Sequence, residues 1–243
     1  MEKTQLFLLH FAGGSSYSYD FIKPYLHDFE IIQLELPGRG RRMDEDLILD
    51  FNMAAQDLFQ QILKRITSTS FFVYGHSMGA YLALKIVSML EKVNKRASYL
   101  IVSGNAGPGV NDPVKRYLLD KHEFRKELKR IGGIPNEIFS NVELLEFYEP
   151  ILRADFQISE EGDFNDVLPV NTPLFAIMGE EEEKVMKISN WANFTKLNFD
   201  YHVFPGDHFF IREQAAGIAD ILRNCKKKAT YFSDFPSRFS SKN

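Results

Sequence analysis

Short apolar runs alternate with amphipathic segments over most of this 243-residue chain. The apolar runs have few polar positions, which is typical of strands buried on both faces of a parallel sheet. Between them, apolar residues recur every three or four positions, as they do on the buried face of a helix. The alternation predicts an α/β fold, with a mostly parallel sheet flanked by helices.

The strand pattern fits six segments: 6–10, 29–36, 70–74, 99–102, 173–178 and 197–204. Helical periodicity covers 55–66, 80–90, 185–195 and a final segment that begins near Ile211. Between 107 and 166 the alternation stops, and helical patterns occur there without a convincing strand. We therefore divide the chain into a core of 1–106 and 167–225 and a helical insertion at 107–166. The insertion is expected to cap one end of the sheet as a lid.

A polar stretch at 226–243 begins with three lysines and has scattered aromatic residues. We expect a flexible tail there, although the aromatic residues leave open a docking segment.

Composition narrows the classes of function. A hydrophobic content of 44% suits one domain with a sizeable core, and a net charge of −4 gives no basic face for nucleic acid. With Cys225 as its one cysteine, the chain can form neither an internal disulfide nor a metal–thiolate cluster. The first apolar run is too short for a signal peptide, and no stretch approaches a membrane span. We expect a cytoplasmic protein that acts as a monomer.

The most informative motif is Gly75-His76-Ser77-Met78-Gly79, which reads G-x-S-x-G. It lies between a predicted strand and a predicted helix, which is the context of a nucleophile elbow in an α/β-hydrolase fold. The two glycines permit a tight turn that lifts the Ser77 hydroxyl clear of the sheet. The amide of Met78 would then face a developing negative charge. A five-residue pattern also arises by chance, so the interpretation depends on partners elsewhere in the chain.

A serine nucleophile needs a base, and His208 is the best placed of the six histidines. It follows the last predicted strand, where the histidine of this fold belongs. The acid that orients the histidine should follow the strand at 173–178, where four consecutive glutamates begin at position 180. From its spacing to the preceding glycine we choose Glu182 as the triad acid, with Glu181 and Glu183 as the alternatives.

The loop after the first strand, Ala12-Gly13-Gly14-Ser15-Ser16, should supply the second amide of the oxyanion hole. Its small residues let a substrate carbonyl approach the backbone. We expect the amides of Met78 and Ala12 to form the hole.

Several of these segments together resemble the type II (external) thioesterases that accompany non-ribosomal peptide and polyketide synthases. The resemblance covers nearly the whole chain up to Cys225. It rests on the loop at 11–15, a P-G-R-G segment within 36–42, the elbow at 75–79, two segments of the insertion at 131–135 and 152–156, and the histidine loop at 206–210. The family normally has aspartate as its triad acid, whereas the corresponding residue here is Glu182.

The resemblance implies hydrolysis of acyl thioesters on the phosphopantetheine arm of an acyl or peptidyl carrier protein, for editing or for product release. His208 would activate Ser77, and neither a cofactor nor a metal would be needed. Apolar residues of the insertion, Ile134, Leu144 and Phe147, either line the acyl chamber or pack only within the lid. The alternatives are a carboxylesterase or acyl-CoA thioesterase on the same fold, or a carrier-binding protein without catalysis.

Three arginines, Arg39, Arg41 and Arg42, follow the second predicted strand. They either bind a phosphate or form a solvated basic turn. Asp155, in the insertion, comes too early in the chain for the triad acid, and we assign it a structural role.

Overall fold

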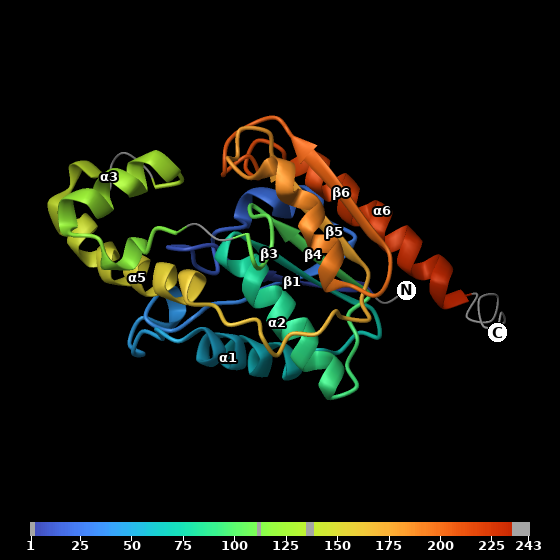
Figure 1. Ribbon diagram of the computed structural model, residues 1–243. Coiled ribbons are helices and arrows are strands. Elements are labelled where there is room, and N and C mark those ends of the chain that lie inside the picture. The colour runs from blue at the N-terminus through green and yellow to red at the C-terminus, as the bar shows by residue number, and fades with distance from the viewer. Residues whose placement is uncertain (1–2, 111–112, 135–138, 235–243) are drawn as a thin grey trace.

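A parallel sheet forms the centre of the molecule (Figure 1). The computed structural model describes residues 3–110, 113–134 and 139–234. Within them the sheet has six strands in the order β2-β1-β3-β4-β5-β6, and every neighbouring pair is parallel. The strands are β1 (Thr4–Leu9), β2 (Phe29–Gln33), β3 (Phe71–His76), β4 (Tyr99–Ser103), β5 (Leu174–Gly179) and β6 (Phe199–Phe204). The predicted fold class is confirmed, and the carboxyl ends of all these strands meet at one edge.

Helices cover both faces of this sheet. On one face lie α1 (Phe51–Leu63) and α2 (Met78–Lys92), together with the 3₁₀ segment η4 (Val185–Phe194). On the other lie α6 (Ala215–Asp234) and the 3₁₀ helix η1 (Asp20–Tyr25). In β1, Phe7 packs on the first face and Leu6 and Leu8 on the second, as the two-residue period of a strand requires. No described helix has the combined length and apolarity that a membrane crossing requires.

The insertion between β4 and β5 is helical. The described part of 107–166 contains no strand and forms η3 (Arg116–Leu118), α3 (Lys121–Ile131) and α5 (Val142–Glu160). Side-chain caps begin both longer helices, because Asp120 accepts from the amide of Glu123 and Asn141 accepts from the amide of Leu144. Figure 1 shows α3 and α5 at the opposite end of the molecule from α6. Positions 111–112 and 135–138 of the insertion lie outside the described residues.

The final helix differs from the expectation of a flexible tail from 226. Helix α6 continues to Asp234, so 226–234 are helical, and 235–243 lie outside the described residues. Two of the three lysines that suggested solvation have partners: the Lys226 ammonium donates to the Asp28 carbonyl oxygen at 2.7 Å, and Lys228 pairs with Asp200 at 2.7 Å. These contacts tie the turn at 226–228 to the residue before β2 and to β6, and they join segments too distant in sequence for periodicity to reveal.

Candidate active site

Ser77 occupies a strained turn between β3 and α2. Its φ of 55° and ψ of −117° lie outside the regions that side chains normally favour. A Cβ at Gly75 would lie 2.0 Å from the Gly79 carbonyl oxygen, and one at Gly79 would lie 2.4 Å from that of Leu9. Both positions therefore require glycine. The turn is tied to the neighbouring strand, because the Ser77 amide donates to the Ser103 carbonyl at 2.7 Å.

The serine has a second tether that the sequence did not indicate. The Asn105 side-chain amide donates to the Ser77 carbonyl oxygen at 2.7 Å, and the Asn105 carbonyl accepts from the Trp191 indole at 2.9 Å. A polar residue two positions after a buried strand is the one available signal. The tether fixes the elbow from the side of β4.

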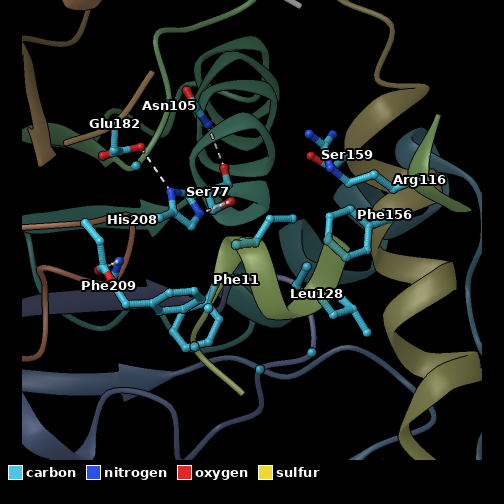
Figure 2. A pocket seen from close by; sticks show the side chains of 18 of the residues that line it. Phe11, Ser77, Asn105, Arg116, Leu128, Phe156, Ser159, Glu182, His208 and Phe209 are labelled. Carbon is cyan, nitrogen blue, oxygen red and sulfur yellow. Dashed lines mark hydrogen bonds and ion pairs between the residues drawn. The ribbon is translucent and has the colours of Figure 1, made fainter. Parts of the chain in front are cut away.

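Ser77, His208 and Glu182 form a continuous hydrogen-bonded chain (Figure 2). His208 Nε2 lies 3.0 Å from Ser77 Oγ, and His208 Nδ1 lies 3.0 Å from Glu182 Oε2. The glutamate side chain is 8% exposed and the histidine 22%, so little solvent screens the pair. The structure thus brings together the three residues that the sequence placed in the triad.

The glutamate is fixed by a second bond. Its Oε1 accepts from the Gly179 amide at 2.9 Å, so the side chain folds back over the end of β5. This return accommodates the methylene that glutamate has beyond aspartate. Glu181 and Glu183 are exposed, and among the described residues Glu182 is the carboxylate bonded to His208.

A second histidine lies beneath the first. His76 is fully buried, its Nδ1 is 2.8 Å from Ser103 Oγ, and its ring centre is 4.9 Å from that of His208. Burial, followed by the nearby His208, holds the pKa of His76 well below its usual value. The neutral ring therefore supports His208 without repelling the positive charge that His208 would carry during catalysis.

The oxyanion loop leaves one amide free. The four amides after Ala12 all donate, in order, to Asp155 Oδ2, the Phe11 carbonyl, Ser18 Oγ and Glu35 Oε1. The Ala12 amide donates to none of the described residues. Met78 is the first residue of α2, so its amide has no intrahelical acceptor. Of the two amides that the sequence assigned to the oxyanion hole, neither donates to a described residue, and Ala12 lines the cavity beside Ser77.

A cavity of about 870 Å³ opens beside the triad. Its floor holds Ser77 and His208, and α3 and α5 supply the opposite wall with Leu128 and Phe156 (Figure 2). Of the two alternatives left open for Ile134, lining the cavity is the one observed, and the residue also packs against the apolar cluster of the lid. In the part of the chain that the structure describes, no group of three or more His, Cys, Asp or Glu side chains is arranged to hold a metal ion.

Two other apolar residues of the insertion do not line the cavity. Leu144 and Phe147 are 42% and 49% exposed, so of the two alternatives left open for them, lining the chamber does not hold. They lie on the outer face of α5, whereas Leu152 and Phe156 of the same helix face the cavity. The sequence shows which residues share one face of the helix. Which face lines the cavity depends on how the helix packs against the core.

The basic segment after β2 is largely neutralised. Arg39 is buried, and its guanidinium binds both carboxylate oxygens of Asp155 at 2.5 and 2.8 Å. Arg42 pairs with Glu45 and Asp57, at 2.6 and 2.7 Å. Neither phosphate binding nor full solvation therefore describes Arg39 or Arg42. Asp155 has the structural contacts that its position suggested.

His10 makes the stability of this region depend on pH. It is buried, its Nδ1 donates to the Phe11 carbonyl, and its Nε2 accepts from the Leu36 amide at 3.4 Å. Burial, with a contribution from the charge of Arg39, lowers the pKa of His10 from 6.5 to about 4. Between pH 6.5 and pH 4 this histidine is protonated in the unfolded chain but neutral in the folded chain. The free energy of unfolding therefore falls as the pH falls.

We expect this histidine to cost about 2 kcal/mol of stability between pH 8 and pH 5. Urea unfolding at the two pH values measures the loss for the wild type and for His10→Asn, which lacks the imidazole. The variant should lose about 2 kcal/mol less than the wild type over the same interval. Equal losses in both proteins would show that His10 does not titrate in this way.

Comparison with known proteins agrees with the geometry. A family model described as Thioesterase domain matches residues 4–229. The structure of ClbQ from the colibactin NRPS/PKS pathway aligns with a TM-score of 0.88 and 25% identity, covering 95% of this chain and 99% of that one. YbtT, a type II thioesterase from the yersiniabactin NRPS/PKS pathway, aligns with a TM-score of 0.85 and 27% identity, covering 94% of each chain.

One sequence relative has a name of another kind. Linear gramicidin dehydrogenase LgrE of Brevibacillus parabrevis is 29% identical over 227 residues, which cover 90% of this chain and 86% of the relative. Here the loop after β1 lacks the G-x-G-x-x-G pattern of a dinucleotide site and faces the serine instead. The elbow, the hydrogen-bonded triad, the fold and a family match over most of the sequence agree: the chain belongs to the thioesterase domain family of the α/β-hydrolase fold and is a hydrolase of thioesters.

Proposed function

We propose that this enzyme removes acyl groups from the phosphopantetheine arm of a carrier protein in a non-ribosomal peptide or polyketide pathway, for editing or release. The observation that carries the proposal is the hydrogen-bonded chain from Glu182 through His208 to Ser77 at the floor of a cavity under α3 and α5. The structural relatives ClbQ and YbtT, which are described as parts of such pathways, support this choice of substrate.

In the first half of the reaction, His208 Nε2 accepts the proton of Ser77 Oγ while that oxygen attacks the thioester carbonyl carbon. Glu182 holds Nδ1–H of the ring and stabilises the imidazolium. The carbonyl oxygen becomes an oxyanion, which accepts from the amides of Met78 and Ala12. The carbon–sulfur bond then breaks, and the arm leaves as a thiolate that takes the proton from His208.

In the second half, His208 accepts a proton from water, and the resulting hydroxide attacks the acyl–serine carbonyl. The bond to Ser77 Oγ breaks, the serine regains its proton from His208, and the carboxylic acid is released. A thiol has a pKa of about 8.5, so the first leaving group departs more readily than an amine would. Acyl transfer to Ser77 therefore depends less on proton donation than on oxyanion stabilisation.

The end of α3 contacts the histidine loop. Gly132 and Gly133 at the end of α3 and Phe209 in the histidine loop line the cavity, and a Cβ at Gly133 would lie 2.1 Å from the Phe209 ring. Helix α3 therefore packs on the core beside the triad. We expect α3 and α5 to act as the lid over the acyl group.

The test compares kcat/KM for three substrates with the same acyl group: an acylated carrier protein, the acyl-CoA and a p-nitrophenyl ester. We expect the carrier substrate to be preferred, with mass spectrometry showing the carrier returned to its free-thiol form. The Ser77→Ala variant is the control for spontaneous hydrolysis. A higher kcat/KM for the ester or the CoA substrate would reject the carrier assignment and favour the simple-ester or acyl-CoA alternative.

A further inference from the structure

Asp155 connects the lid to the oxyanion loop. It lies in α5, its side chain is fully buried, and its Oδ2 accepts from the Gly13 amide at 2.7 Å. Arg39 neutralises the carboxylate through two bonds, at 2.5 and 2.8 Å. A carboxylate so deeply buried is stable only with such partners, because an unpaired charge there would lose its hydration. The carboxylate oxygen that accepts from the Gly13 amide is thus fixed in place beside the loop.

The bond to Gly13 bears directly on Ala12. Two peptide planes flank this residue, and both are held. The plane before it is held because the Phe11 carbonyl accepts from the Gly14 amide at 2.9 Å. The plane after it is held because the Gly13 amide donates to Asp155. Since the carbonyl and amide of one trans peptide point in opposite directions, fixing the Phe11 carbonyl aims the Ala12 amide away from Gly14.

Helix α5 also contacts the loop through an apolar side chain. Gly13 has a φ of +74°, and a Cβ there would lie 2.5 Å from Leu152 Cδ2. Leu152 and Phe156 of this helix line the acyl cavity. The same helix therefore contacts both the place of the acyl group and the loop that would hold the oxyanion.

We propose that Asp155, held by Arg39, is a positioning residue that sets the Ala12 amide for oxyanion binding, so that the oxyanion hole is complete only when α5 is seated as observed. The proposal deepens the proposed function, because it depends on catalysis at Ser77. It makes the lid helix part of the machinery that places the loop, in addition to covering the substrate.

The test separates the Gly13 bond from the ion pair by working in an Arg39→Met background. There, Asp155→Asn keeps an oxygen acceptor for the Gly13 amide without a charge, whereas Asp155→Leu has the same shape and no acceptor. Replacing a buried ion pair by neutral groups of similar volume often preserves stability. Melting temperatures are measured for both double variants, and kinetics are run well below the lower one.

With a p-nitrophenyl ester, we expect Arg39→Met/Asp155→Leu to lower kcat about 30-fold. This loss is smaller than the roughly 10²–10³-fold loss in kcat caused by deleting an oxyanion-hole donor, because the Ala12 amide is displaced and not removed. KM should stay within about twofold, since the acyl cavity is unchanged. Arg39→Met/Asp155→Asn should stay within about threefold of the wild-type kcat. An alkylboronic acid, which forms a tetrahedral adduct on Ser77, should lose affinity for the leucine variant in parallel with kcat.

Equal kcat values in the two double variants would overturn the proposal and leave Asp155 a structural residue. So would a loss of kcat with unchanged boronic acid affinity, because the defect would then lie outside the oxyanion hole. If the leucine variant does not fold, Arg39→Met/Asp155→Val replaces it with the same expected result. Glu149→Gln breaks a lid ion pair with Arg153 on the same helix, away from the loop, and should keep wild-type kcat.

These measurements are independent of the carrier assignment. The ester and the boronic acid need only Ser77 and its hole, so a protein that fails the carrier comparison can still support the role of Asp155. A protein that prefers carrier substrates can equally show no effect at Asp155.

Discussion

Ser77→Ala should lower kcat about 10⁶-fold, because the hydroxyl is the atom that attacks the carbonyl and no neighbouring group can replace it. The loss should be similar with carrier thioesters and with p-nitrophenyl esters. Stopped assays with radiolabelled acyl substrate measure a residual rate this small. Binding of the acylated carrier should persist, since the cavity wall and the outer surface are unchanged.

The matched control is Ser189→Ala, an exposed serine in η4 that should retain wild-type kcat. A Ser77→Ala protein that still hydrolyses the thioester within tenfold of the wild type would require a different nucleophile. Formation of a covalent adduct between a fluorophosphonate and the wild type, but not the variant, locates the reactive hydroxyl directly.

Glu182→Ala should lower kcat by about 10³–10⁴ while KM changes little, because the carboxylate stabilises the imidazolium and does not contact the acyl group. Glu182→Gln should be similarly impaired, since an amide can hold the ring in the wrong tautomer. Glu182→Asp should fall between the wild type and these two variants: it restores the charge, but its shorter side chain cannot reach both His208 and the Gly179 amide. Steady-state kinetics on one ester and one thioester measure all three.

The neighbouring glutamates provide the internal comparison. Glu181→Ala and Glu183→Ala remove exposed carboxylates of the same loop and should leave kcat within about twofold of the wild type. A severe loss in either, with Glu182→Ala active, would contradict the assignment of the triad acid.

The strands and most helices were predictable because their signals are local. A strand buried on both faces needs an unbroken apolar run, and a helix with one buried face needs a period near 3.6. The elbow was equally local, because its glycines are required by atoms within five residues of one another and in the adjoining β1. The sequence pattern gave no sign that the last helix continues beyond 226, because the contacts at that turn come from Asp28 and Asp200 in distant segments.

The sequence by itself determined the α/β architecture, the serine and the histidine, since each depends on short-range pattern or on order along the chain. Tertiary structure decided which of four glutamates reaches His208, because the fold of one loop over Gly179 buries Glu182 and exposes its neighbours. It also decided that Arg39 would meet Asp155, 116 positions away, beneath the oxyanion loop. Buried polar groups pair with the partners that the tertiary structure places beside them, and the spacing of residues along the sequence does not show which partners those are.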